Sequence, residues 1–184
     1  PWGSHALRCS IGKARTARHN RLHDWLAAAY ARATLMPTVT EQRVPEWDIV
    51  DPATGEVERA VADIATVDHR TGQNVWVDVT VVCEHSEDHS RQQARARNDG
   101  AAAALAANAK RQRYALAGSG LVPFALEAGG RPCDETVALV RCCGEAAEPT
   151  GQTCSTAALW QQCSSLLQLG NGEVLLSALG GRGG

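Results

Sequence analysis

The chain has 184 residues and a mass of 19.5 kDa, with 44% hydrophobic residues, 21% charged residues and a formal net charge of −2. This composition, together with the lack of an apolar run of about 18 residues, argues against a disordered chain, a collagen-like fibre and a membrane span. Aromatic residues make up only 4% of the chain. We therefore expect a soluble globular domain whose core consists of Val, Leu, Ile and Ala on packed helices and strands.

The first predicted element is an amphipathic helix from Thr16 to Ala33, because apolar residues recur there at steps of three and four. Thr16 is the expected N-cap, and Pro37 prevents any continuation of the helix. A short strand is expected over Val39–Val44, where side chains alternate, followed by a loop that contains several proline and glycine residues.

Two β-branched runs, Val61–Val67 and Val75–Val82, are separated by the turn-forming stretch His69–Asn74. This pattern predicts a β-hairpin. The second run is apolar on both faces except at Asp78 and Thr80, which is typical of a central strand buried on both sides.

The remaining chain predicts one more strand and several helices. The expected strand is Leu121–Glu127. A long helix is expected over Ser90–Leu116, with a weak point at Asn98–Gly100, and a second helix from Asp134 or Thr136 through Val140. After a polar linker at Glu145–Gly151, two more helices are expected, Ser155–Leu169 and Glu173–Leu179. The order of elements favours an α/β fold in which helices flank a small mixed β-sheet. The glycine-rich end is expected to fray.

The charges are unevenly distributed: residues 1–32 and 91–113 are basic, whereas residues 33–63 are acidic. Two basic segments around an acidic one suit a metal site between phosphate-binding surfaces. Solvated helix faces are the alternative interpretation.

Seven cysteines without a short repeating spacing, and no segment that resembles a secretory signal, predict a reducing, intracellular location. Because the sequence begins at Pro1 without an initiator Met, we expect it to be part of a longer polypeptide.

Asp63 and Asp78 lie in the two runs of the predicted hairpin, where an ionised carboxylate needs a cation or a hydrogen-bond donor nearby. If the two side chains converge, they form a pair of oxygen donors that suits Mg²⁺, with the Val79 carbonyl as a third donor. Alternatively, the aspartates lie at strand ends or pair with a neighbouring arginine.

Phosphodiester cleavage at such a site also needs a protein cation near the phosphate. Thr80 occupies the strand position where a lysine would be the obvious candidate, so the nearest alternative is Lys110, which shares a helix face with Arg113 and Tyr114. A solvated helix end with its tyrosine in the core is the other interpretation of this cluster.

Together, Asp63, the run Val77–Val82 and the pattern Lys110-x-x-Arg113-Tyr114 resemble the restriction-like endonuclease domain of non-LTR retrotransposon polyproteins. That domain belongs to the PD-(D/E)xK nuclease superfamily, with the lysine moved from the strand to the following helix. The resemblance implies a restriction-endonuclease-like core with a C-terminal helical extension. It also implies a magnesium-binding (or manganese-binding) enzyme that nicks target DNA to prime reverse transcription.

The resemblance also implies roles for individual residues. Asp63 and Asp78 would hold the metal, Lys110 would act on the attacking water or the scissile phosphate, and Tyr114 would support the site. The sequence departs from the family pattern in three places: Ala62 replaces a proline, Arg113 replaces a lysine, and the first helix offers His19 or His23 where many of these enzymes have a glutamate.

The resemblance further implies partners and boundaries. DNA would be the substrate, and the rest of the reverse transcriptase polyprotein and its RNA would be partners. The location would be intracellular, and nuclear if the host is a eukaryote. The expected DNA-binding residues are Arg15, Arg18, His19, Arg21, Arg111 and Arg113. The expected divisions are 1–15, a remnant of a zinc-knuckle-like linker, 16–144, the nuclease domain, and 145–184, the helical extension and tail. His5 and Cys9 supply half of a zinc site that only a longer chain would complete.

Two other functions remain open on the sequence. The first is a nuclease-like fold that binds DNA without cutting it, and the second is a decayed or structural interaction domain.

Overall fold

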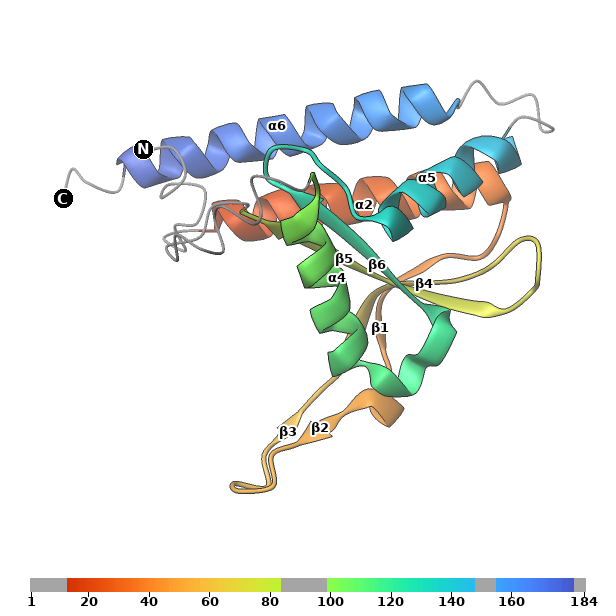
Figure 1. The fold of residues 1–184 in the computed structure, drawn as a ribbon, viewed down its shortest axis with the longest axis vertical. Helices are drawn as coiled ribbons and strands as arrows, with labels where there is room; N and C mark the ends of the chain where they lie inside the picture. The colour runs from red at the N-terminus through yellow and green to blue at the C-terminus, as the bar shows by residue number, and fades with distance from the viewer. Residues whose placement is uncertain (1–12, 84–98, 148–154, 181–184) are drawn as a thin grey trace.

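The computed structural model describes residues 13–83, 99–147 and 155–180. It is a mixed α/β fold in which a four-stranded sheet of order β1-β4-β5-β6 is flanked by helices (Figure 1), as the sequence predicts. The larger elements are α2 (Ala14–Thr34), β1 (Val39–Arg43), β4 (Val61–Val67), β5 (Asn74–Val82), α4 (Ala101–Arg113), β6 (Leu121–Glu127), α5 (Asp134–Ala147) and α6 (Thr156–Gly180).

The sheet is antiparallel from β1 to β5, whereas β6 runs parallel to β5. A parallel neighbour requires a crossover connection, and α4 lies in that connection. The ladder between β4 and β5 ends at the pair Ile64 and Val77, so the next residues in register are Asp63 and Asp78. The predicted hairpin is therefore confirmed, and its register brings the two aspartates to the same level.

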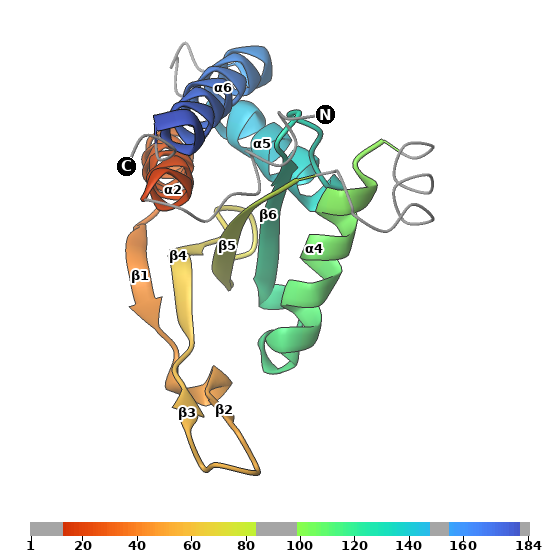
Figure 2. The ribbon, with the colours of Figure 1, turned by 90° about the vertical axis from the view of Figure 1, so that its left-hand side faces the viewer.

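Helices cover both faces of the sheet (Figure 2). Val77, Val79 and Phe124 pack with α2, α5 and α6 in the main core. Ala125 alternates with Phe124 along β6 and packs against α4 on the opposite face. Asp78 alternates with Val77 and Val79, so it belongs to the face that α4 covers.

Helix α2 begins earlier than the sequence suggests. It starts at Ala14 after Lys13, and Thr16 is already inside its first turn, so the prediction of Thr16 as N-cap is wrong. The helix ends at Thr34, and its C-cap Leu35 has a left-handed backbone (φ 58°) and donates its N–H to the Ala31 carbonyl. Pro37 follows shortly afterwards, as expected.

Helix α4 begins at Ala101, after Gly100 with φ 75°. The weak point predicted at 98–100 is therefore a helix start, and the predicted helical residues 90–98 lie outside the described residues. The helix ends at Arg113 and is followed by the 3-10 helix η2 (Ala115–Gly120), so a continuous helix through Leu116 is not formed.

The two helices predicted at the C-terminal end are one. Helix α6 continues through Gly170 and Gly172, and the prediction of a break between 169 and 173 is wrong. Helix α5 continues to Ala147, so the expected boundary between 144 and 145 falls inside a helix and residues 145–147 are not linker. Figure 1 shows α6 lying alongside α2 and α5.

A small two-stranded ribbon replaces the loop expected after β1. The 3-10 helix η1 (Pro45–Trp47) leads into β2 (Ile49–Val50), which pairs antiparallel with β3 (Val57–Glu58). Figures 1 and 2 show the ribbon extending from the end of the molecule opposite α6. Strands of two residues leave no periodic signal in the sequence, which is why the pattern indicated only a loop.

Among the helices of the described ranges, none is long and apolar enough to cross a membrane. The predicted zinc ligands His5 and Cys9 lie outside the described residues.

Candidate active site

Asp63 and Asp78 meet where β4 and β5 separate. The Val79 N–H donates to Asp63 Oδ2 at 2.6 Å, so the amide of β5 binds a side chain at the point where the ladder ends. This bond fixes the Asp63 carboxylate against the backbone next to Asp78. The three residues predicted to hold a metal are thus brought together.

Lys110 reaches Asp78 from α4. Its Nζ lies 2.9 Å from Asp78 Oδ1 and 3.0 Å from Oδ2, while Thr80 Oγ1 donates to Oδ1 at 3.2 Å. The Asp78 side chain is only 5% exposed and that of Lys110 is 31% exposed. Burial raises the pKa of Asp78, and the Lys110 ammonium opposes this rise.

His19 approaches Asp63 from α2. Its Nε2 lies 3.7 Å from Asp63 Oδ1, and this neighbouring carboxylate raises the pKa of His19. Burial acts to raise the pKa of Asp63, but the interactions with His19 and the Val79 N–H outweigh it, and the pKa is lowered. The two aspartates therefore shift in opposite directions, as expected for paired acids in different environments.

His23 lies one turn further along α2 and has a structural role. Its Nε2 donates to the Asp63 carbonyl oxygen at 2.7 Å, and its Nδ1 lies 2.8 Å from Asp24 Oδ1. The ring stacks on His19 with a centroid distance of 6.1 Å. His23 thus joins α2 to β4 and orients the histidine that faces the carboxylate.

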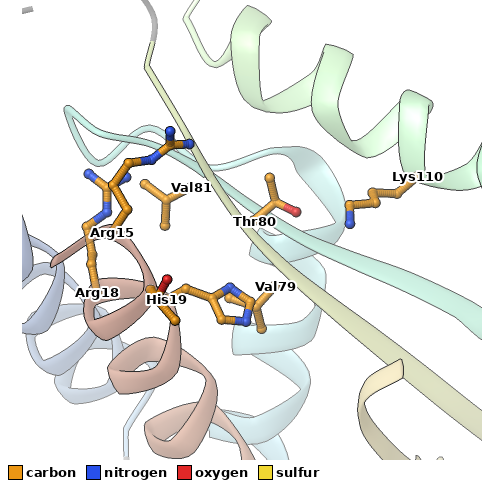
Figure 3. A pocket seen from close by; sticks show the side chains of 8 residues that line it. Arg15, Arg18, His19, Val79, Thr80, Val81 and Lys110 are labelled. Atoms are coloured by element: carbon orange, nitrogen blue, oxygen red, sulfur yellow. The ribbon is translucent and has the colours of Figure 1, made fainter. Parts of the chain in front are cut away.

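A pocket of about 440 Å³ opens between α2, β5 and α4 (Figure 3). Figure 3 shows Arg15 and Arg18 at one end and Lys110 at the other, with β5 crossing between them. The lining residues are Arg15, Thr16, Arg18, His19, Val79, Thr80, Val81 and Lys110. The pocket is therefore rich in cationic groups and adjoins the two carboxylates.

The start of α4 is held by β6. Gly100 has no side chain to cap the helix, and the Glu127 carboxylate accepts a hydrogen bond from the Ala102 N–H at 2.9 Å instead. Glu127 is buried, and a carboxylate at a helix N-terminus is favourable. This contact fixes the helix that carries Lys110.

Tyr114 supports the site through packing. Its ring lies 5.5 Å from that of Trp47, in a buried cluster with Ala62 and Leu121. Lys110 Nζ lies 5.9 Å from the ring centroid. The ring of Tyr114 thus lies beside Lys110 and is buried in the cluster that contains Trp47.

The residues predicted to bind DNA divide into two groups. Arg15, Arg18 and His19 line the pocket. The other three form ion pairs: Arg21 with Glu173 at 2.8 Å, Arg111 with Glu135, and Arg113 with Glu58 at 2.6 Å.

The donors suit a hard divalent cation, because two carboxylates and a backbone carbonyl offer oxygen atoms only. Within the described ranges there is no group of three or more His, Cys, Asp and Glu side chains that could hold a metal. Any ion at this site would therefore depend on water or phosphate oxygens for the rest of its coordination, as Mg²⁺ often does.

Three residues of the site have roles that the sequence reasoning missed: Thr80, Glu127 and Asn171. Thr80 donates to Asp78, Glu127 caps α4, and the Asn171 side chain accepts a hydrogen bond from Arg18. The sequence could have indicated Glu127, because an acidic residue at the end of an apolar strand needs a hydrogen-bond donor or a cation nearby. The contact of Asn171 depends on the packing of α6, for which the sequence has no local signal.

No family model matches the chain, and no curated protein matches it either. The interpretation of the site therefore depends on its geometry.

Proposed function

We propose that this chain is a metal-dependent DNA endonuclease domain, similar to the domains that nick target DNA so that a retroelement can prime reverse transcription. One observation supports this above all: Asp63, Asp78 and Lys110, from three different elements, meet beside a single cationic pocket. The proposed partners are duplex DNA, the rest of a reverse transcriptase polyprotein and its RNA, in the nucleus if the host is a eukaryote.

Asp63, Asp78 and the Val79 carbonyl are the proposed ligands of Mg²⁺ or Mn²⁺. When bound, the ion would offset the negative charge that develops on the phosphate and lower the pKa of the attacking water. The Val79 N–H would keep the Asp63 carboxylate in place throughout the reaction.

Lys110 is the proposed catalytic cation. Its ammonium group, held by Asp78, would donate a hydrogen bond to the scissile phosphate or orient the water for in-line attack. Water adds its oxygen to phosphorus while the bond to the 3′ oxygen breaks, leaving a 3′ hydroxyl and a 5′ phosphate. Tyr114 and Glu127 would position the lysine without touching the substrate.

The test is nicking of supercoiled plasmid with Mg²⁺, Mn²⁺ or EDTA. We expect metal-dependent nicks with 3′ hydroxyl ends, and a loss of rate of about 100-fold or more in Asp63→Asn, Asp78→Asn and Lys110→Met. Asp51→Asn and Arg70→Met are matched controls, because they alter an exposed aspartate and an exposed ion pair away from the pocket. An inactive wild-type chain, or equal nicking by wild type and variants, would overturn the proposal.

DNA binding without cleavage is the second candidate function. The contacts of Asp78 favour it. Both carboxylate oxygens of Asp78 lie against the Lys110 ammonium, and Thr80 donates to one of them, so these contacts use the oxygens that a metal ion would need. The same experiment separates the two functions. A chain that retards duplex DNA with and without EDTA but never nicks it would be a binding module.

A further inference from the structure

Arg18 is a buried cation in the wall of the pocket. The residue is 3% exposed, and its Nη1 donates to Asn171 Oδ1 at 2.7 Å. Its Nε is buried and has no hydrogen-bond partner. A buried charge whose Nε lacks a hydrogen-bond partner is costly, and a bound anion would offset that cost.

A second cation lies near Arg18. Burial lowers the pKa of Arg18, the nearby charge of Arg15 lowers it further, and Cys83 opposes both effects. Both residues line the pocket, and Figure 3 shows their guanidinium groups at the same end. Two positive charges placed together repel one another, and an anion bound beside them offsets this repulsion.

The first turn of α2 contributes to the same end of the pocket. Helix α2 has 21 residues, no side-chain cap at Lys13 and no acidic residue in its first turn. Thr16, in that turn, lines the pocket. The positive end of the helix dipole and the first N–H groups of a helix favour an anion, a phosphate above all.

The Arg18 side chain is held in place by α6. A Cβ at Gly170 would lie 2.5 Å from Arg18 Cγ, so the helix and the arginine are in close contact there. The Asn171 amide that holds Nη1 is itself fixed, because its Nδ2 donates to the Ala128 carbonyl at 2.7 Å. Arg18 is therefore preorganised, which lowers the entropic cost of binding.

We propose that Arg18 and the first turn of α2 form a phosphate subsite, separate from the carboxylate pair, for a DNA phosphodiester next to the one that is cut. The assignment to DNA rests on the proposed function. Phosphate binding itself does not, since it needs neither metal nor cleavage. The subsite would hold the strand at the arginine end of the pocket while the scissile phosphate lies at the Lys110 end.

The first experiment follows the Arg18 Nε–H resonance by NMR while inorganic phosphate is added to the full chain in EDTA. We expect a saturable shift of this resonance and of the first-turn amides. Thr16→Asp is the decisive variant, because an acid in the first turn favours the helix but repels phosphate. Its phosphate affinity should fall by about tenfold or more.

Arg18→Met is the second variant, with circular dichroism as the check on folding. If it unfolds, Thr16→Asp alone decides the test. A non-saturating shift, or equal phosphate affinity in wild type and Thr16→Asp, means an adventitious ion only and overturns the subsite.

The second experiment identifies the source of the phosphate. Metal-free duplex binding is measured against salt concentration, with and without a 5′-terminal phosphate on the duplex. A bound internal phosphodiester predicts equal affinity for the two duplexes and a salt slope smaller by about 0.9 in Thr16→Asp. A requirement for the terminal phosphate, or an unchanged slope, contradicts the assignment to an internal phosphodiester.

The failures of the two proposals are distinguishable. If the wild-type chain nicks DNA but its Arg18 Nε–H resonance does not shift when phosphate is added, the subsite is overturned and the nuclease proposal stands. Saturable phosphate binding by a chain that never nicks DNA would overturn the nuclease and leave the phosphate site standing.

Discussion

Lys110 Nζ lies 2.9 Å from Asp78 Oδ1, although the two residues are 32 positions apart in the chain. The contact joins the middle of β5 to the last turn of α4. It makes the proposed catalytic cation and a proposed metal ligand one coupled unit, and the first prediction measures that coupling.

A double-mutant cycle with Asp78→Asn and Lys110→Met is expected to give a coupling energy of about 1–3 kcal/mol in the free energy of unfolding. Lys110→Met should be the more destabilising single change, because it leaves a buried carboxylate without its cation. Urea unfolding monitored by circular dichroism measures both. The exposed pair Arg70 and Glu145 is the matched control cycle and should couple by less than about 1 kcal/mol. Equal coupling in the two cycles would contradict the prediction.

The pH dependence of stability should change in opposite directions in the two aspartate variants. The pKa of Asp63 is lowered from 3.8, so its contribution to stability is present above 3.8 and is lost as pH falls through the folded pKa. The pKa of Asp78 is raised from 3.8, so the folded state holds its proton more tightly and stability falls as pH rises through the folded pKa.

Relative to wild type, Asp63→Asn should therefore become less stable as pH rises from about 3 to about 7, and Asp78→Asn more stable. Urea midpoints across this range measure the two differences. Differences of the same sign would show that the two carboxylates do not have the environments described.

Helix α6, which packs against Arg18, offers two glycines for comparison. Gly170→Ala places a Cβ against the Arg18 side chain and should destabilise the fold by about 1–3 kcal/mol. Gly172→Ala, two residues further along α6, meets nothing within 4 Å and should stabilise by about 0.5–1 kcal/mol. Thermal unfolding of the two variants gives the answer, and a gain in both would exclude the close contact.

Tyr114 is expected to act through its ring. Tyr114→Phe should keep nicking within a few-fold of wild type, whereas Tyr114→Ala should lose about 3–5 kcal/mol of stability, because the ring fills the cluster around Trp47. Nicking rates and urea unfolding separate the two effects. A large loss of rate in a stable Tyr114→Phe chain would give the hydroxyl a direct role.

The core strands could be predicted because their β-branched runs are long enough to show a pattern. Asp63 and Asp78 could be paired from the sequence for the same reason, since a hairpin fixes which residues face each other. Lys110 could be named from the sequence as the nearest candidate cation, but its role at the site came from the family resemblance, because nothing local to α4 says that its last turn reaches β5.

The errors have physical causes too. The segment Gly170–Gly172 has the local signal of a helix break, but contacts of Gly170 and Asn171 with Arg18 of α2 and with Ala128, just after β6, keep α6 continuous. Thr16 has the residue type of an N-cap, yet α2 starts two residues before it. In both cases tertiary contacts or neighbouring turns outweigh a local preference.

The hydrogen bond between Arg18 and Asn171 joins two residues 153 positions apart, one on the first described helix and one on the last. The cationic end of the pocket is thus assembled from both ends of the described chain. Shortening the protein before Asn171 would remove the acceptor that orients the guanidinium. Any truncated version for crystallisation or assay should accordingly retain α6.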